Sequence, residues 1–187
     1  MADSKRLSAR AQSMRIAFCG MMCALSVVLM LTGGLIPVMT YVSPLFAGIL
    51  LLPLMLEFGR KYAWTAYAAT ALIVLLLGMD KEAAFFYLFL GYYPLLKWEI
   101  EKLPKKPLRQ ALKLALFTIA MAAMYCILAF LLHLEAVTAD FQEMGRVWTI
   151  LFFVMMDVCM LLYDRLLMPL VILYANRIKP KLKFLKR

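Results

Sequence analysis

Apolar residues in this chain gather into six long runs that are separated by short polar segments. The runs cover 16–35, 41–58, 62–79, 83–96, 111–134 and 147–167. A helix needs about 20 predominantly apolar residues to cross a bilayer, and most of the runs approach that length. The pattern predicts an all-α membrane protein, built as a compact bundle of six transmembrane helices.

Three features modify this simple picture. Pro53 predicts a kink in the second helix, and Pro169 predicts a break or kink after the sixth. The fourth run, 83–96, has only 14 residues. At about 1.5 Å per residue it covers roughly 21 Å, which is less than the hydrocarbon core. Its outer end is therefore expected to lie below the membrane surface.

The loops are too short to hold a folded extramembrane domain. The chain 1–187 is thus expected to form a single six-helix domain with a short basic N-terminal segment (1–14) and a basic C-terminal tail (about 168–187). The tail alternates apolar and basic residues, a pattern typical of a segment on the inner membrane surface. The first run is too long for a cleavable signal peptide.

Positive charge is distributed very unevenly about these runs. All but two of the 21 Lys and Arg fall on one side of the six-span arrangement, and only Lys81 and Arg146 fall on the other. Because basic residues stay on the cytoplasmic side during insertion, both termini are expected to be cytoplasmic in a multi-pass protein of the cell membrane.

Composition agrees with lipid as the main solvent. Apolar residues make up 65% of the chain and the mean hydropathy is +0.84. A soluble domain has about 45–50% apolar residues. The net charge of +10 flanks apolar runs, which indicates anionic membrane lipids rather than nucleic acid as its partner.

The turn formed by Asp80, Lys81 and Glu82 separates the third and fourth runs almost without a loop. Charged groups at membrane depth need a water-filled recess or partners. One interpretation is recognition of a polar ligand by these three residues. The other is a solvated hairpin whose carboxylates cap the N-terminus of the fourth helix.

Three further residues are candidates for the same recess. Tyr87 lies one turn into the fourth helix, and Tyr41 and Ser43 stand at the outer start of the second. Aromatic rings with a polar tip suit flat organic ligands, but Tyr is also common at membrane interfaces. Tyr92 and Tyr93, near Lys97, are expected to form such an interfacial belt on the inner side.

Asp157 stands near the middle of the sixth helix, where an isolated carboxylate is costly and should face the bundle interior. It is a candidate to bind a ligand or cation, to carry a proton, or to accept hydrogen bonds from Thr, Tyr or Trp. Asp164 lies seven residues further on and shares the same helix face.

Metal and catalytic chemistry have little support in this sequence. His133 and Glu135 could join Asp80 and Glu82 in a metal site, but their spacing does not favour one. The four Cys lie in apolar runs and are interpreted as buried thiols. Neither a Walker A sequence nor a nucleophile elbow occurs. We therefore expect no enzyme activity, no metal and no cofactor.

In the first helix, Gly20 and Ala24 form a small-xxx-small pair beside Ala17. Such a face lets another helix approach closely, either inside the bundle or on a partner subunit.

Several of these features together resemble the substrate-binding (S) components of energy-coupling factor transporters. They are the basic N-terminus leading into residues 15–25, the sequence Tyr41-Val42-Ser43-Pro44, and the short third and fourth helices. In that family an Ala-x-x-x-Ala signature on the first helix contacts the coupling subunit, and Gly20-x-x-x-Ala24 stands in its place here.

The resemblance implies capture of a small, vitamin-like organic micronutrient from outside a prokaryotic cell. A transmembrane coupling subunit and two ATPase subunits would then energise uptake. Two alternatives remain open from the sequence: a membrane scaffold or accessory subunit without a small-molecule ligand, and a stand-alone secondary carrier that uses Asp157.

Overall fold

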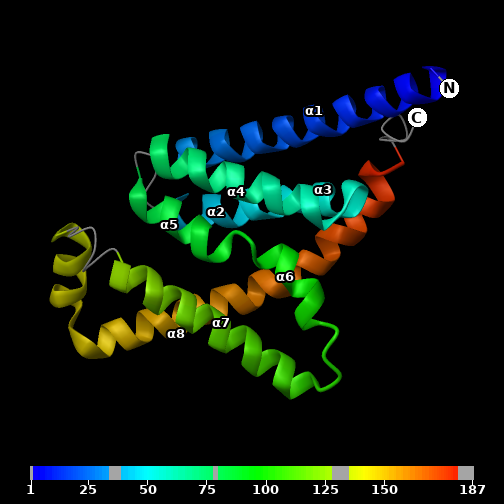
Figure 1. The fold of residues 1–187 in the computed structure, drawn as a ribbon. Helices are drawn as coiled ribbons and strands as arrows, with labels where there is room; N and C mark the ends of the chain where they lie inside the picture. Colours follow the sequence, from blue (N-terminus) through cyan, green and yellow to red (C-terminus); the bar gives the residue numbers. More distant parts are fainter. Residues whose placement is uncertain (1, 34–38, 78–79, 128–134, 181–187) are drawn as a thin grey trace.

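The computed structural model describes residues 2–33, 39–77, 80–127 and 135–180 of the 187. All the elements found there are helices (Figure 1). In chain order they are α1 (Ala2–Gly33), α2 (Met39–Ile49), α3 (Leu51–Phe58), α4 (Arg60–Leu77), α5 (Lys81–Leu90), α6 (Tyr93–Ile100), α7 (Lys106–Cys126), α8 (Glu135–Leu173) and the π-helix η2 (Tyr174–Ile178). The all-α prediction is confirmed for this part of the chain.

Two helical segments in the described part are long and apolar enough to cross a bilayer. They are Gln12–Gly33 in α1 and Met39–Phe58, which comprises α2 and α3. Both correspond to predicted spans.

The second predicted helix is interrupted, as Pro53 led us to expect. α2 ends at Ile49 and α3 starts at Leu51, two residues before the proline. The proline ring lacks an N–H and crowds the carbonyl four residues earlier, here that of Ile49, so the helical ladder breaks at this point. The two pieces together still extend over 20 residues.

The fourth predicted helix is wrong in its bounds. In place of one short helix over 83–96, the chain forms α5 and α6, with a turn at Gly91 and Tyr92 between them. Pro94 occupies the first turn of α6, where its missing N–H costs nothing. Residues 81–100 therefore reach roughly 30 Å at helical rise, so the length of this segment gives no reason to place the outer turn below the membrane surface.

Two other predicted boundaries also differ. The polar segment between the fourth and fifth runs, 97–110, was expected to be a loop but is largely helical, because α6 continues to Ile100 and α7 begins at Lys106. At Pro169, where a break or kink was predicted, the helix does not break: α8 continues through the proline to Leu173 and then widens into η2. A proline lowers the stability of a helix interior, but neighbouring contacts can maintain the helix through it.

The helices pack around two hydrophobic cores. In one, α1 lies against α2 and α4, and the core includes Ala47, Leu54 and Tyr87. The other joins α5 and α6 to α7 and α8 around Phe86 and Phe117. Figure 1 shows α1 and α4 on one side of the molecule and α7 and α8 on the other. α2 and α5 contribute residues to both cores and so connect the two halves.

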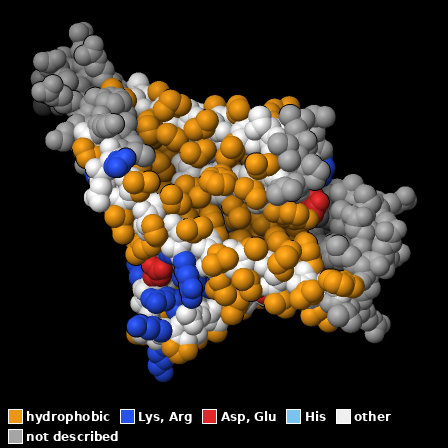
Figure 2. All heavy atoms as spheres, turned by 180° about the vertical axis from the view of Figure 1, so that it is seen from behind, with side chains coloured by type: hydrophobic (Ala, Val, Ile, Leu, Met, Phe, Trp, Pro, Cys, Tyr) orange, Lys and Arg blue, Asp and Glu red, His pale blue; other side chains and the backbone are white. Residues whose placement is uncertain are grey.

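Large apolar side chains cover much of the outer surface. Leu76, Ile119, Trp148 and Ile150 are each more than three-fifths exposed. Figure 2 shows an apolar band across the molecule, with Lys and Arg gathered at the end that holds the α6–α7 connection. Exposed apolar surface on this scale marks contact with lipid or with other proteins.

The beginning of α1 and the η2 segment lie at the same end of the molecule (Figure 1). The last turn of α4, the first turn of α5 and the start of α2 lie at the opposite end. We call these the terminal end and the turn end.

Candidate functional site

Two polar pairs join α2 to α5 at the turn end. The Thr40 hydroxyl donates to Asp80 Oδ2 at 2.8 Å. The next residue of α2, Tyr41, donates from its hydroxyl to Oε1 of Glu82, two residues beyond Asp80. The structure thus brings together three of the predicted site residues, Tyr41, Asp80 and Glu82, and adds Thr40, which sequence reasoning missed. We call these four residues the turn-end cluster.

Asp80 also caps a helix, as one of the two sequence interpretations proposed. Its Oδ1 accepts a hydrogen bond from the Ala83 backbone N–H at 3.0 Å, which satisfies one of the orphan donors at the start of α5. Lys81 turns back instead and donates from Nζ to the Leu75 carbonyl at 2.9 Å, near the end of α4. Its exposed side chain is therefore directed to α4 rather than to the cluster.

Tyr87 and Ser43 belong to the packing of the helices. Tyr87 is fully buried, with its ring 5.5 Å from that of Tyr67 on α4, and its hydroxyl has no hydrogen-bond partner among the described residues. Ser43 is 2% exposed and donates to Met30 Sδ on α1 at 3.9 Å. The expectation that both line an open recess is corrected, because each lies at an interface between helices.

The two interrupted helices cross at their breaks. A Cβ atom on Gly48, at the end of α2, would lie 2.8 Å from the carbonyl oxygen of Gly91, which begins the turn between α5 and α6. Only a glycine permits this approach of one backbone to another. Both breaks fall near the middle of 20-residue segments, so the crossing occupies the middle of the bundle.

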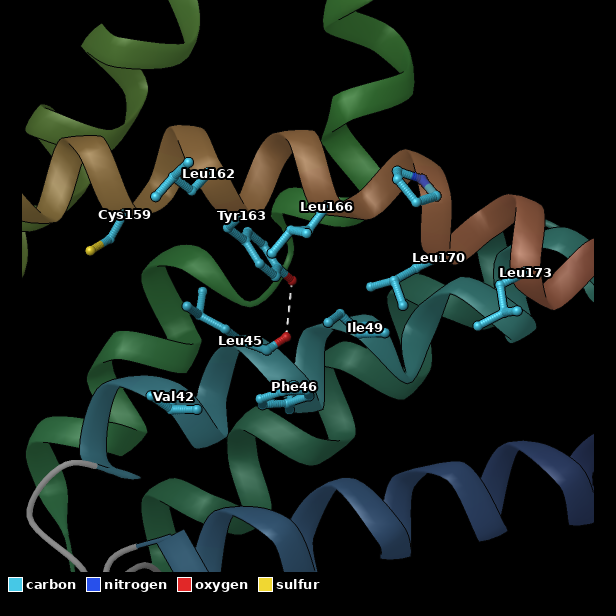
Figure 3. A pocket seen from close by; sticks show the side chains of 11 residues that line it. Val42, Leu45, Phe46, Ile49, Cys159, Leu162, Tyr163, Leu166, Leu170 and Leu173 are labelled. Carbon is cyan, nitrogen blue, oxygen red and sulfur yellow. Dashed lines mark hydrogen bonds between the residues drawn. The ribbon is translucent and has the colours of Figure 1, made fainter.

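A groove of about 620 Å³ lies beside this crossing, between α2 and α8 (Figure 3). From α2 it is lined by Val42, Leu45, Phe46 and Ile49. From α8 it is lined by Cys159, Leu162, Tyr163, Leu166, Leu170 and Leu173, together with Pro169. Its volume falls within the range of about 300–1,000 Å³ that is usual for small-molecule sites.

The chemistry of the groove is almost entirely apolar. Its most polar lining side chain is Tyr163, whose hydroxyl donates to the Leu45 carbonyl at 2.9 Å across the groove (Figure 3). A donor already used in this way offers little to a ligand. The groove therefore suits an apolar body and would leave the polar groups of a hydrophilic solute unpaired.

A buried charged cluster joins α6, α7 and α8, and sequence reasoning missed it. Asp164 Oδ1 lies 2.8 Å from Lys97 Nζ, and its Oδ2 lies 2.7 Å from Lys113 Nζ. The Tyr93 hydroxyl also donates to Asp164. Glu101 is 3.4 Å and 3.5 Å from the two lysines, so two cations face two carboxylates.

The interpretation of Tyr93 as part of an interfacial belt was wrong, because its side chain is buried at 0% exposure. Lys97 and Lys113 were counted from the sequence among the cytoplasmic charges, and that side stays a prediction. Their burial, at 4% exposure each, was not foreseen. The sequence does contain one acidic residue, Asp164, and two lysines within or beside apolar runs. Lys113 and Lys97 are 51 and 67 residues away from Asp164 along the chain, so the sequence alone does not show that the three meet.

Asp157 accepts a hydrogen bond from the Thr118 hydroxyl on α7 at 3.0 Å. This contact corresponds to the structural alternative of the sequence analysis, in which a Thr holds the carboxylate. His133 lies outside the described residues, as do the side chains of Glu135 and Arg146. No group of three metal-ligating side chains is present in the part that the structure describes.

The small residues of α1 lie on its outer face. Ala17, Gly20 and Ala24 are all exposed, and a Cβ on Gly20 would meet nothing within 4 Å. Their neighbour Cys23 turns inward and lies 3.5 Å from the Ala66 carbonyl. Within the part of the chain that the structure describes, no other helix packs closely against this face.

Comparison with protein-family models, curated protein sequences and solved structures finds no match to this chain.

Proposed function

We propose that the chain is an integral membrane protein that captures a small organic micronutrient at its turn end and passes it to partner subunits. In this proposal it crosses a cell membrane six times, with both termini in the cytoplasm. The spans are α1, α2 with α3, α4, α5 with α6, α7, and α8. The proposal retains the resemblance to S components of energy-coupling factor transporters.

The crossing of the two interrupted helices is the observation that carries this proposal. Membrane proteins that bind solutes commonly form their sites from discontinuous helices near the bilayer midplane. Here α2–α3 and α5–α6 meet at their breaks, Gly48 against Gly91. The same two helices carry Tyr41 and Glu82 at their turn ends. A polar ligand that competes for these side chains would act directly on both broken helices.

Support for the orientation comes from charge. The basic residues of the α6–α7 connection lie at one end of the molecule, and the apolar band lies across its middle (Figure 2). Basic flanks favour the cytoplasm, so the turn end would face outside. Support for a coupling partner comes from the exposed small face of α1, Ala17, Gly20 and Ala24, where another helix can approach closely.

Ligand capture is tested by gentle detergent extraction followed by mass spectrometry of the small molecules that remain bound. We expect one organic solute to be retained by the wild type and lost in the Tyr41→Phe/Glu82→Gln double variant. The matched control is Glu99→Gln, an exposed carboxylate in a hydrogen bond with Arg60 on the other side of the helix breaks. Equal retention by all three proteins contradicts the proposal.

Partner docking is tested separately by co-purification. We expect Gly20→Leu with Ala24→Leu to abolish association with a transmembrane coupling subunit and its ATPases. The control is Ala68→Leu with Ala69→Leu, which places the same bulk on an exposed face of α4. Association that survives the α1 substitutions excludes this face as the docking surface.

A second candidate function, a scaffold or accessory subunit, is favoured by the internal pairing of the turn-end cluster. Asp80 already bonds Thr40 and the Ala83 N–H, so part of its capacity is used within the protein. For a scaffold, Asp80→Ala with Lys81→Ala should leave partner binding unchanged, and no solute should be retained.

A further inference from the structure

We propose that the groove between α2 and α8 is a site for one anionic membrane phospholipid, with an acyl chain along the groove and the phosphate at the terminal end. This site is separate from the turn-end cluster, and it rests on the proposed function only for the membrane setting and the orientation.

The lining excludes a polar occupant. The Tyr163 hydroxyl, the only hydroxyl among the lining side chains, already donates to the Leu45 carbonyl at 2.9 Å. The rest of the lining consists of apolar side chains and Cys159. An acyl chain needs no hydrogen bonds, so this lining accepts it without leaving a polar group of the ligand unpaired.

Side chains on both walls are open to the surroundings of the protein. Phe46 on α2 is 55% exposed, and Leu166 and Leu173 on α8 are 59% and 50% exposed. Figure 3 shows these walls facing one another across the space between the two helices. Lipid can therefore enter sideways without passing through the bundle.

Positive charge at the terminal end selects the headgroup. The α8 positions that line the groove recur every three to four residues up to Leu173, and Arg177 continues this series one turn later in η2. Arg177 is exposed. Beside it Lys179 Nζ lies 3.6 Å from Glu57 Oε1, so the nearby carboxylate already has a cation. A phosphate near Arg177 would lie at the cytoplasmic leaflet in the proposed orientation, where anionic lipids are enriched.

The test is native mass spectrometry of the purified full chain, titrated in detergent with phosphatidylglycerol or with phosphatidylcholine of the same acyl chains. We expect one tightly retained phosphatidylglycerol and weaker phosphatidylcholine. Leu166→Trp, which fills the groove, should weaken retention at least tenfold. Ile172→Trp, at a similarly exposed position of α8 that does not line the groove, should not.

The headgroup is tested by a second pair of variants. Arg177→Gln should reduce the preference for phosphatidylglycerol about fivefold, the effect expected for one cation near a membrane surface. Arg165→Gln, an exposed arginine about a quarter-turn from the groove face, should leave it unchanged.

Three results would overturn the proposal. The first is equal retention of phosphatidylglycerol and phosphatidylcholine by the wild type. The second is retention of phosphatidylglycerol by Leu166→Trp as strong as by the wild type. The third is a wild-type dimer that Leu166→Trp converts to a monomer. The last would identify the groove as an interface between two copies of the chain.

Discussion

Removing the negative charge of Asp164 should be among the most destabilising single changes in this protein. The substitution Asp164→Asn keeps the size of the side chain but leaves Lys97 and Lys113 with only Glu101 as a carboxylate partner. The lysine side chains are 5% exposed, so water cannot solvate their ammonium groups in place of the lost carboxylate.

The size of the effect follows from the distances. At 2.7–2.8 Å and an effective dielectric constant of about 20, each Asp164–lysine pair is worth roughly 6 kcal/mol of Coulomb energy. Desolvation of the ions offsets most of this gain. The measurable loss when one member of a buried pair is removed is about 3–5 kcal/mol, and we expect that value for Asp164→Asn.

An exposed pair in the same protein provides the comparison. Arg60 and Glu99 also form an ion pair, but their side chains are 49% and 36% exposed. Such a pair contributes about 0–1 kcal/mol. Unfolding by titration with SDS in mixed micelles, followed by tryptophan fluorescence, should therefore separate Asp164→Asn clearly from Glu99→Gln.

A double variant distinguishes charge balance from simple loss of contact. Adding Lys113→Gln to Asp164→Asn removes one cation as well as one anion and restores neutrality. We expect it to recover part of the lost stability, with a coupling energy of about 0.5–3 kcal/mol between the two sites. Two results would show that the buried cluster does not hold these helices together. One is a loss of stability for Asp164→Asn no larger than that for Glu99→Gln. The other is additivity of the effects of Asp164→Asn and Lys113→Gln.

Three smaller effects should be visible in the same unfolding assay. Gly48→Ala should cost about 1–3 kcal/mol, because its Cβ would lie 2.8 Å from the Gly91 carbonyl oxygen. Gly20→Ala should be neutral or stabilising by up to about 1 kcal/mol, since nothing lies within 4 Å of the added atom; a large loss would contradict the exposed position of Gly20. Asp80→Ala should cost about 0.5–2 kcal/mol through the lost α5 cap, and an unchanged midpoint would exclude that role.

The helices were predictable because their signal is local. Long apolar runs with few charges favour helices, which satisfy every backbone group within one segment. Pro53 marked the α2–α3 break for the same local reason. The α5–α6 break was missed because Gly91-Tyr92-Tyr93-Pro94 lies within a continuous run without charge, and hydropathy does not report backbone angles.

The turn-end cluster was partly predictable. Asp80 and Glu82 stand out as charges between apolar runs, and Tyr41 was placed near them because α2 and α5 were both expected to start on the same side. Lys81 belongs to the same run of charges but turns to α4, since adjacent residues in a helix point in different directions. Thr40 carries no such local signal.

Hydropathy and charge along the chain were sufficient to predict the all-α class and the apolar surface. Both properties depend on the summed hydropathy of residues that are neighbours in the sequence. The packing of the helices decided which polar groups became partners. Lys113 and Asp164 are 51 residues apart, and their 2.7 Å contact exists only because α7 and α8 cross there. The same packing placed Gly48 against Gly91 and opened the α2–α8 groove, since close approach and empty volume depend on distances between helices rather than on order along the chain.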